Sequence, residues 1–151
     1  MYGGLYQWDE MMQYTTTQGV QGICPDGWHL PTDEEWKVLE GAVDSQYGVG
    51  DPEWDLGGWQ GFDAGLNLKS NYGWYLEGNG TDLFGFKGLP GGGRSYNGYF
   101  YYIGDYGIWW SATEDNSTYA WFRDLLYLYS DVYRDYASKA CGYNVRCLRD
   151  Y

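Results

Sequence analysis

Few residues in this chain of 151 amino acids are of a type that could do chemistry. The single histidine, His29, lies between Trp28 and Leu30, and no nucleophile or carboxylate stands beside it in the sequence as a general base would require. Acidic residues at positions 33 to 35 could suggest a metal site, but the first turn of a helix explains them equally well. We therefore expect no catalytic residue and no metal ligand, and we assign His29 a packing role.

The three cysteines leave one thiol over after any single disulfide. Cys24 and Cys147 could pair and close a long loop, whereas Cys141 stands among tyrosine and serine residues. The sequence contains no CxxC pair and no cluster with the spacing of metal ligands. Cysteine chemistry is therefore expected to be structural.

Composition and charge limit the partners of the chain. Aromatic residues make up 21% of the sequence and there are 24 glycines, which predicts an ordered domain rich in loops and partly exposed rings. The net charge of −12 opposes binding to a phosphate backbone. No run of about 18 apolar residues is present, and no basic end followed by an apolar run marks a signal peptide. We expect a monomer with no nucleic-acid partner and no membrane insertion.

The clearest local element is a helix over residues 32 to 43, because Thr32 and Glu35 have the spacing of a capping box. Trp36, Leu39 and Val43 then fall on one helix face. The remaining elements expected from pattern are an opening strand over residues 4–8, long ordered loops over 48–65 and 66–86, two strands at 99–103 and 108–112, and further strands after residue 121.

The final segment carries the most informative pattern. Residues 121, 123, 125 and 127 (Trp, Arg, Leu and Tyr) alternate with residues 122, 124, 126 and 128 (Phe, Asp, Leu and Leu). A strand with this alternation presents two chemically different faces. We expect one face to belong to the scaffold and the other to make contacts with a ligand.

Four motifs occur in order along the chain: CPDGWHLPTDEEW at 24–36, LPGGGR at 89–94, YGIWWSATE at 106–114 and NVRCLRD at 144–150. Together they resemble the Fibrobacter succinogenes major paralogous domain, over about residues 4 to 150. The resemblance implies one α+β domain over residues 1–151 with a C-type-lectin-like fold, in the variant shared with formylglycine-generating enzymes. In that fold the chain ends meet in one sheet, so the resemblance also implies a structural disulfide between Cys24 and Cys147.

Proteins with this fold have three uses. Calcium-dependent sugar binding needs an acid- and proline-bearing loop and a Trp-Asn-Asp strand, and the nearest text here, Asp51 to Asp55, has oxygen ligands in a different order. Catalysis as in formylglycine-generating enzymes needs reactive cysteines in an arrangement that these three do not match. The third use is variable ligand binding, as in the variable proteins of diversity-generating retroelements, whose C-terminal residues are rewritten at adenines.

The sequence permits a test of this third use. Randomising the two adenines of an Asn codon gives Tyr, Asp, Ser, Phe, Leu, Ala or Cys among others, but never Lys, Glu, Gln, Met or Trp. Twelve residues of the final segment belong to the permitted set, and the first eleven of them are our candidate binding residues: Phe122, Asp124, Leu126, Leu128, Tyr129, Asp131, Tyr133, Asp135, Tyr136, Ala137, Ser138 and, as the unpaired cysteine, Cys141.

The resemblance therefore predicts a non-enzymatic protein that displays a diversified surface toward a protein or glycan on another surface, outside the producing cell or on a phage particle. The twelve residues should cluster on one exposed face, while the interspersed Trp121, Arg123, Leu125, Tyr127, Val132 and Arg134 should be buried or paired. No cofactor is expected. The alternative is a fixed carbohydrate-binding module that uses Trp and Tyr platforms, with or without calcium.

Overall fold

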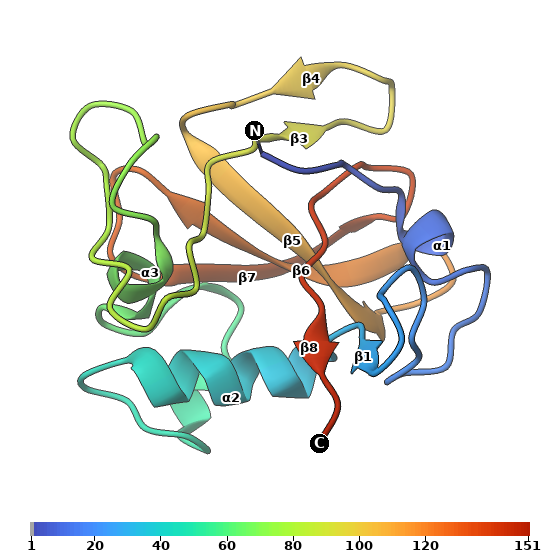
Figure 1. Cartoon of the computed structure of the whole chain (residues 1–151), viewed down its shortest axis with the longest axis horizontal. Helices are drawn as coiled ribbons and strands as arrows, with labels where there is room; N and C mark the ends of the chain where they lie inside the picture. Colours follow the sequence, from blue (N-terminus) through green and yellow to red (C-terminus); the bar gives the residue numbers. More distant parts are fainter. Residues whose placement is uncertain (1) are drawn as a thin grey trace.

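The computed structural model describes residues 2–151 and shows an α+β architecture of short helices and small antiparallel sheets (Figure 1). In chain order the elements are α1 (Trp8–Met11), β1 (Trp28–His29), α2 (Asp33–Val43), the 3₁₀ helix η1 (Pro52–Asp55), β2 (Gly58–Gln60), α3 (Ala64–Leu68), β3 (Gly93–Arg94), β4 (Phe100–Tyr101), β5 (Tyr106–Glu114), β6 (Tyr119–Leu126), β7 (Val132–Ser138) and β8 (Leu148–Arg149). Among residues 2–151, no helix has the length and apolar character needed to cross a membrane.

A four-stranded antiparallel sheet in the order β2-β7-β6-β5 forms the centre of the molecule. Two further pairs, β1 with β8 and β3 with β4, lie outside it. In Figure 1, α2 runs below the sheet and the β3–β4 pair lies above it. The two faces of the sheet are therefore covered by different parts of the chain.

Helix α2 begins where the capping box predicted. The Thr32 hydroxyl accepts a hydrogen bond from the Glu35 backbone N–H at 3.2 Å, and the Glu35 carboxylate accepts from the Thr32 backbone N–H at 2.9 Å. These bonds satisfy two of the N–H groups that a helix start leaves free. The predicted helix is thus confirmed, with Thr32 as its N-cap.

The sheet separates two apolar cores. On the side of α2, residues of the helix, the loops and the odd positions of β5 and β6 pack together, including Trp36, Trp54, Trp109, Leu125 and Val132. On the other side, α1 and the even positions of β5 and β6 form a second cluster that includes Trp8, Met11, Ile108, Trp110 and Phe122. Successive side chains of a strand point to opposite faces, which is why Trp109 and Trp110 lie in different cores. Both tryptophans are buried.

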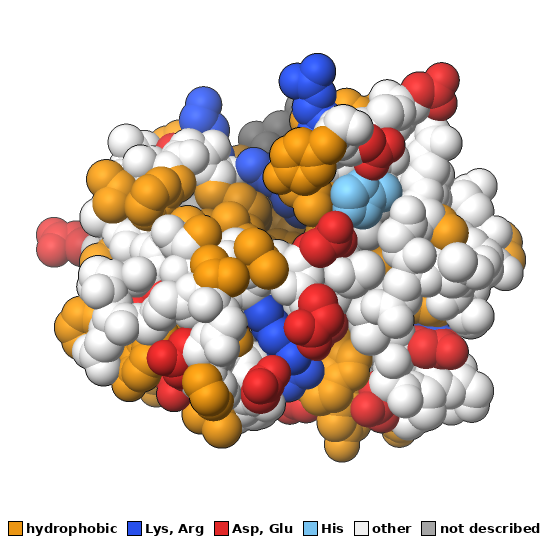
Figure 2. Space-filling model, turned by 90° about the horizontal axis from the view of Figure 1, so that it is seen from below, with side chains coloured by type: hydrophobic (Ala, Val, Ile, Leu, Met, Phe, Trp, Pro, Cys, Tyr) orange, Lys and Arg blue, Asp and Glu red, His pale blue; other side chains and the backbone are white. Residues whose placement is uncertain are grey.

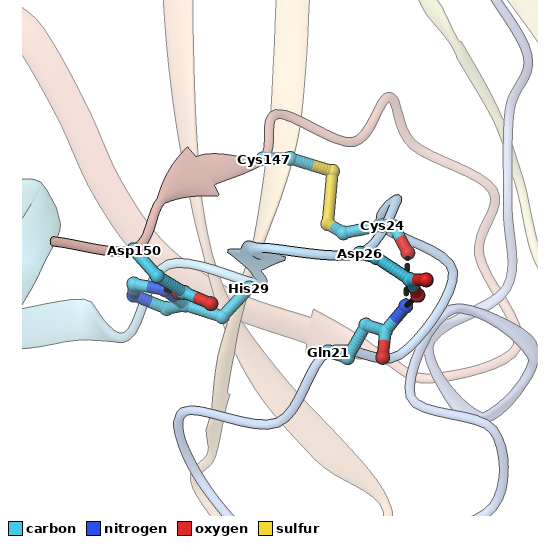
Figure 3. The surroundings of a disulfide bond; sticks show 6 residues. All are labelled: Gln21, Cys24, Asp26, His29, Cys147 and Asp150. Atoms are coloured by element: carbon cyan, nitrogen blue, oxygen red, sulfur yellow. Dashed lines mark hydrogen bonds and ion pairs between the residues drawn. A yellow bond between two sulfur atoms is a disulfide. The ribbon is translucent and has the colours of Figure 1, made fainter.

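Strand β8, near the C-terminus, pairs with β1, and the disulfide that the resemblance implied lies beside this pair. Cys24 and Cys147 form a disulfide that links residues 123 positions apart, with their Cα atoms separated by 5.8 Å (Figure 3). Beside it, the Gln21 side-chain amide donates to the Cys24 carbonyl at 2.9 Å and to Asp26 Oδ1 at 3.0 Å. A covalent bond across such a long loop restricts the unfolded chain strongly.

Three expectations from local pattern were wrong, two of them only in part, because a short strand does form within 99–103 and residues 69–86 contain no helix or strand. Residues 4–8 make only an isolated bridge between Tyr6 and Tyr143, and Trp8 already starts α1. The strand expected at 99–103 shrinks to β4, which pairs with β3 instead of β5. The supposed loops of 48–65 and 66–86 contain η1, β2 and α3. For β2 and β4 the reason is that long-range pairing decides which short segments become strands, and local sequence does not encode the partner.

Candidate ligand-binding site

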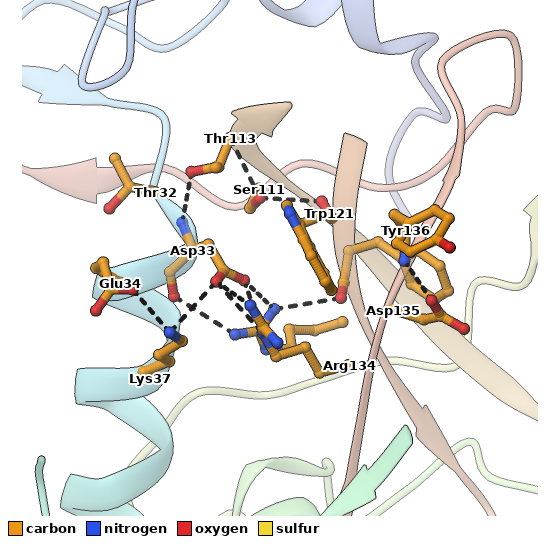
Figure 4. A network of polar contacts seen from close by, with 12 residues as sticks. Thr32, Asp33, Glu34, Lys37, Ser111, Thr113, Trp121, Arg134, Asp135 and Tyr136 are labelled. Carbon is orange, nitrogen blue, oxygen red and sulfur yellow. Dashed lines mark hydrogen bonds and ion pairs between the residues drawn. The ribbon is translucent and has the colours of Figure 1, made fainter. Parts of the chain in front are cut away.

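The face of the central sheet toward α2, here called the inner face, is fixed by a buried ion-pair network. Arg123 of β6 donates through Nη1 to Asp33 Oδ1 at 2.7 Å and through Nε to Glu40, and Arg134 of β7 donates through Nη2 to Asp33 Oδ2 at 2.7 Å. Figure 4 shows the part of this network around Asp33 and Arg134, where the helix start meets the sheet. Lys37 of α2 adds a contact to Asp33 Oδ2 at 3.7 Å. The network ties β6 and β7 to α2.

The network also sets the protonation of its acids. Burial opposes ionisation of Asp33, but hydrogen bonds from Arg134 and the charge of Arg123 outweigh it, so the Asp33 pKa lies below its usual range. Burial raises the pKa of Glu40 to about 6 in spite of the adjacent Arg123. On the same face, the Arg134 guanidinium stacks over the Trp121 ring, 4.0 Å from its centroid. These contacts account for Trp121, Arg123 and Arg134 as scaffold.

The opposite face, here called the outer face, presents a straight row of one residue from each strand. Trp59 pairs with Tyr133, Tyr133 with Asp124, and Asp124 with Ile108. The Trp59 and Tyr133 ring centroids are 5.0 Å apart. Neighbours across strands on one face are close enough to form a common surface. Asp124 therefore lies in the middle of an otherwise apolar and aromatic row.

A pocket of about 380 Å³ opens over this row. This volume falls within the range typical of small-molecule sites, about 300 to 1,000 Å³. Its nine lining residues come from five strands and from the segments next to them: Trp59, Tyr101, Tyr102, Tyr106, Ile108, Phe122, Asp124, Tyr133 and Tyr143.

Asp124 is the one charged residue that lines the pocket. It is 7% exposed, and its Oδ1 has no hydrogen-bond partner among the described residues. Burial, with a smaller contribution from the charge of Asp135, raises the pKa of Asp124 to about 8. A buried carboxyl with an unused acceptor is rare in proteins and indicates a position kept for something other than stability.

One wall of the pocket is held in an uncommon backbone conformation. Tyr102 has φ = 60°, in the left-handed region that bulky residues seldom adopt. Its ring lies 4.9 Å from the ring of Tyr101 and 4.9 Å from that of Tyr106. These contacts, one edge to face and one tilted, hold the Tyr102 ring in the pocket lining.

The turn between β6 and β7 extends the site beyond the pocket. The Tyr129 ring meets Trp59 edge to face at 4.6 Å, which joins the turn to the aromatic row. Lys69 Nζ donates hydrogen bonds to the backbone carbonyls of Leu126 at 3.0 Å and Tyr129 at 2.8 Å. Burial lowers the pKa of Lys69 to about 8. The lysine thus fixes the turn through hydrogen bonds to its backbone.

The candidate residues predicted from sequence occupy several separate places instead of one. Phe122, Asp124 and Tyr133 line the pocket, and Asp135 reaches its edge by accepting from the Tyr133 hydroxyl at 3.0 Å. Cys141 belongs to the apolar core that includes α1, and Ala137 packs against it. Leu128, Tyr129 and Asp131 lie in or next to the β6–β7 turn.

The expectation of one exposed face was therefore wrong. Phe122, Asp124, Leu126 and Cys141 are buried. Tyr136 packs against Trp121 on the inner side, with ring centroids 5.4 Å apart, and Ser138 shares that side by alternation. Three consecutive strand residues, 136 to 138, have no way to point in one direction.

Sequence reasoning also missed residues that build the site. Trp59, Tyr101, Tyr102, Tyr106 and Tyr143 line the pocket but come from segments without a binding pattern of their own. Their only signal in the sequence was the high aromatic content, which does not say which rings gather.

The other residues considered from sequence have structural partners. Asp51 accepts from the Glu53 backbone N–H at 2.9 Å, Glu53 accepts from the Gly61 backbone N–H at 2.8 Å, and Asp55 pairs with Lys37 at 2.8 Å. No group of three His, Cys, Asp or Glu side chains within residues 2–151 has the arrangement of a metal site. These carboxylates thus cap and brace the loop that carries η1.

His29 binds the two acids that flank it in space. Its Nδ1 contacts Asp150 Oδ1 at 2.6 Å and its Nε2 contacts Glu35 Oε1 at 2.9 Å. The hydrogen bond with Asp150 raises the pKa of His29, assisted by Glu35 and opposed by partial burial. Seen from the α2 side, the pale blue histidine lies beside red acidic side chains on a surface of dispersed charges (Figure 2). His29 clamps β1 to the C-terminal residues and to α2.

Comparison with known proteins places this architecture in a family. The family model described as the Fibrobacter succinogenes major domain matches residues 1–149. Searches of curated proteins and of solved structures returned no match. The resemblance predicted from the four sequence motifs is thus confirmed across almost the whole chain, and the chain belongs to the Fibrobacter succinogenes major domain family.

Proposed function

We propose that this protein is a non-enzymatic ligand-binding domain with a C-type-lectin-like fold, and that its binding site is the outer-face pocket together with the β6–β7 turn. The observation that carries the proposal is the unequal use of the two faces of β6 and β7. On the inner face Arg123 and Arg134 are bound to Asp33. On the outer face the unpartnered carboxyl of Asp124 lies among aromatic rings.

The site combines two kinds of position. Tyr101, Tyr106 and Tyr143 line the pocket from outside the set of changeable residues, whereas Phe122, Asp124 and Tyr133 belong to it. We propose that the first group forms a constant frame and that mutagenic reverse transcription rewrites the second. Leu128 and Tyr129, both exposed in the turn, would vary with them. Tyrosine suits such a surface because it offers a large contact area with few rotatable bonds.

Binding would rest on contact complementarity with little conformational change. The inner-face network, the Cys24–Cys147 disulfide and the Lys69 contacts hold the elements that present the site. A rigid site loses little entropy when a ligand binds. The disulfide also fits a protein that works in an oxidising environment, so we propose an extracellular, cell-surface or phage-particle location and a protein or glycan target.

The diversification part of the proposal is tested at the gene locus. A nearby repeat that is almost identical to the coding sequence, with adenines at the changeable codons and a reverse transcriptase gene beside it, is expected. Codons at the twelve positions should end in C or T. If most of them end in a purine, or if no template repeat exists, the domain is not a product of this kind of diversification.

A fixed carbohydrate-binding module is the second candidate, and the aromatic row around Trp59 and Tyr133 favours it, because sugar rings stack on such surfaces. A glycan array probed with and without a chelator separates the two. One sugar bound strongly and lost on chelation would support a calcium-dependent module. Sugar binding unaffected by chelator but lost in Trp59→Ala would support a calcium-independent one.

A further inference from the structure

The pocket has an acidic floor that the protein itself leaves unsatisfied. Asp124 stands at the centre of the sheet, and the registers of β5 and β7 place Ile108 on one side of it and Tyr133 on the other. Neither side chain supplies a donor to its Oδ1, which has no hydrogen-bond partner among the described residues. A buried polar atom without a partner costs stability, and a ligand that donates to it or carries positive charge offsets that cost.

The walls favour a cation. Trp59, Phe122 and five tyrosines line the pocket together with this carboxyl, and the faces of aromatic rings carry negative potential that attracts ammonium groups. Asp135, which accepts from the Tyr133 hydroxyl at 3.0 Å, adds a second negative charge near the floor. None of the nine lining residues is Lys or Arg. An anion would therefore find no positively charged partner among the lining residues.

We infer that this pocket binds an alkylammonium group, with the Asp124 carboxylate facing the nitrogen and the rings of Tyr106, Phe122 and Tyr133 around its carbon atoms. The inference rests on the proposed ligand-binding role of the outer face and names the chemical class of its ligand. The unpartnered, buried oxygen of Asp124 distinguishes this ligand from a neutral sugar, which would carry no charge to offset that of the carboxylate.

Two natural sources present this chemistry: a lysine side chain on a protein and a quaternary ammonium group such as that of choline. The test uses both as separate probes, Nα-acetyl-lysine amide and choline. A neutral analogue of choline, 3,3-dimethyl-1-butanol, has the same shape without the charge. Titrations are run near pH 9 in an amine-free buffer, where the Asp124 carboxyl is ionised and a lysine amine, with a pKa of about 10.4, keeps its proton.

The readout comes from the methyl groups of the three isoleucines, labelled with ¹³C, together with titration calorimetry. Ile108 lines the pocket, whereas Ile23 packs against the cluster that includes α1 but is not in the pocket lining, and Ile103 is exposed outside the lining. At least one cationic probe is expected to shift the Ile108 methyl signal in a saturable way while the Ile23 signal stays still. The neutral analogue should bind at least about tenfold more weakly.

Three variants complete the experiment. Asp124→Asn keeps the shape and removes the charge, so it should weaken cation binding at least about tenfold. Asp9→Asn makes the same change on the exposed side of α1 and should leave binding unchanged. Tyr102→Gly relieves the left-handed backbone at φ = 60° while it removes a wall, so it should stay folded and bind more weakly.

Binding of lysine amide alone supports a protein target, and binding of choline alone supports a small molecule or lipid headgroup. If neither cation shifts the Ile108 methyl signal, the inference is overturned. It is also overturned if the neutral analogue binds as tightly as choline, or if Asp124→Asn binds the cations as tightly as the wild type. That failure would leave the proposed function standing, because the template repeat and the glycan array test the proposed function without reference to cations.

Discussion

Arg123 and Asp124 are neighbours in β6, and their side chains lie on opposite faces of the sheet in opposite electrostatic conditions. Arg123 is 1% exposed and bound by Asp33 and Glu40 of α2. Asp124 is also buried, but one of its oxygens has no partner. One residue is therefore bound within the fold, whereas the next keeps an unused acceptor, which is the basis of the proposed binding site.

Asp124→Asn should make stability less dependent on pH. The folded-state pKa of about 8 lies above the unfolded value near 3.9, so the protonated carboxyl favours folding. This contribution is complete below about pH 4 and is lost as pH rises through about 8. The variant should therefore exceed the wild type in free energy of unfolding at pH 9, by on the order of 2–5 kcal/mol, as measured by urea denaturation.

The same comparison at pH 4 is the internal control for this prediction. At that pH the carboxamide of the variant and the protonated carboxyl of the folded wild type are both neutral, so the difference in free energy of unfolding should shrink. Asp135 is the charged group nearest to the site and is present in both proteins. A variant less stable than the wild type at pH 9 would show that the Asp124 carboxylate stabilises the fold, and the pocket would lose its unsatisfied floor.

Arg123→Ala should destabilise the protein severely. It leaves the fully buried Glu40 and part of Asp33 without a counter-charge, a change that typically costs about 3–5 kcal/mol. Arg149→Ala, on the exposed strand β8, is the matched control and should change stability by about 0.5 kcal/mol or less. Thermal and urea unfolding measure both, and a similar small loss for the two variants would refute the structural role of the network.

His29 should titrate above its ordinary pKa of 6.5. The hydrogen bond with Asp150 is the main cause, so Asp150→Asn should lower the His29 pKa, whereas Asp26→Asn, at an acid that contacts Gln21 and not His29, should not. Because the chain has one histidine, its ring protons give a single proton NMR titration curve. The clamp contributes stability fully below about pH 6.5 and loses it as pH rises through the higher folded-state pKa. A titration curve with the ordinary pKa of 6.5 would show that His29 does not make the hydrogen bond with Asp150.

Replacing Cys24 and Cys147 together by Ala should lower the free energy of unfolding by about 2–5 kcal/mol, because the bond closes a loop of 123 residues in the unfolded chain. Cys141→Ser is the control. This thiol is buried and unpaired, so its replacement should lower the free energy of unfolding by about 1 kcal/mol and leave ligand binding unchanged. Equal losses for the two variants would mean that the bond adds nothing beyond the packing of its sulfur atoms.

The sequence was most informative where local chemistry decides the structure. The Thr32 capping box located α2 within one residue, because the cap hydrogen bonds form among neighbours. Alternation along residues 121 to 126 correctly separated Arg123 and Leu125 from Phe122 and Asp124. The family resemblance came from motifs spread over the whole chain.

The site was less accessible to prediction, because its walls come together only in the fold. Trp59 reaches Asp124 through two strand pairings, β2 with β7 and β7 with β6. Tyr101 and Tyr102 arrive with the β3–β4 pair. A codon pattern shows which positions a retroelement could change, but not which of them the fold buries. For this reason Leu126 and Cys141 were expected on the exposed binding surface, although the fold buries both.

The most direct test of the central claim compares how the two faces tolerate change. One library carries NNY codons at Asp124, Leu128, Tyr129 and Tyr133, and the other carries them at Arg123, Leu125, Val132 and Arg134. Each library is displayed on a cell surface, and the folded fraction of its members is measured by their resistance to a protease. Most members of the first library should remain folded and few of the second, because the second set is buried against α2. Equal tolerance of the two libraries, or a better result for the second, would contradict the division between a structural inner face and a changeable outer face.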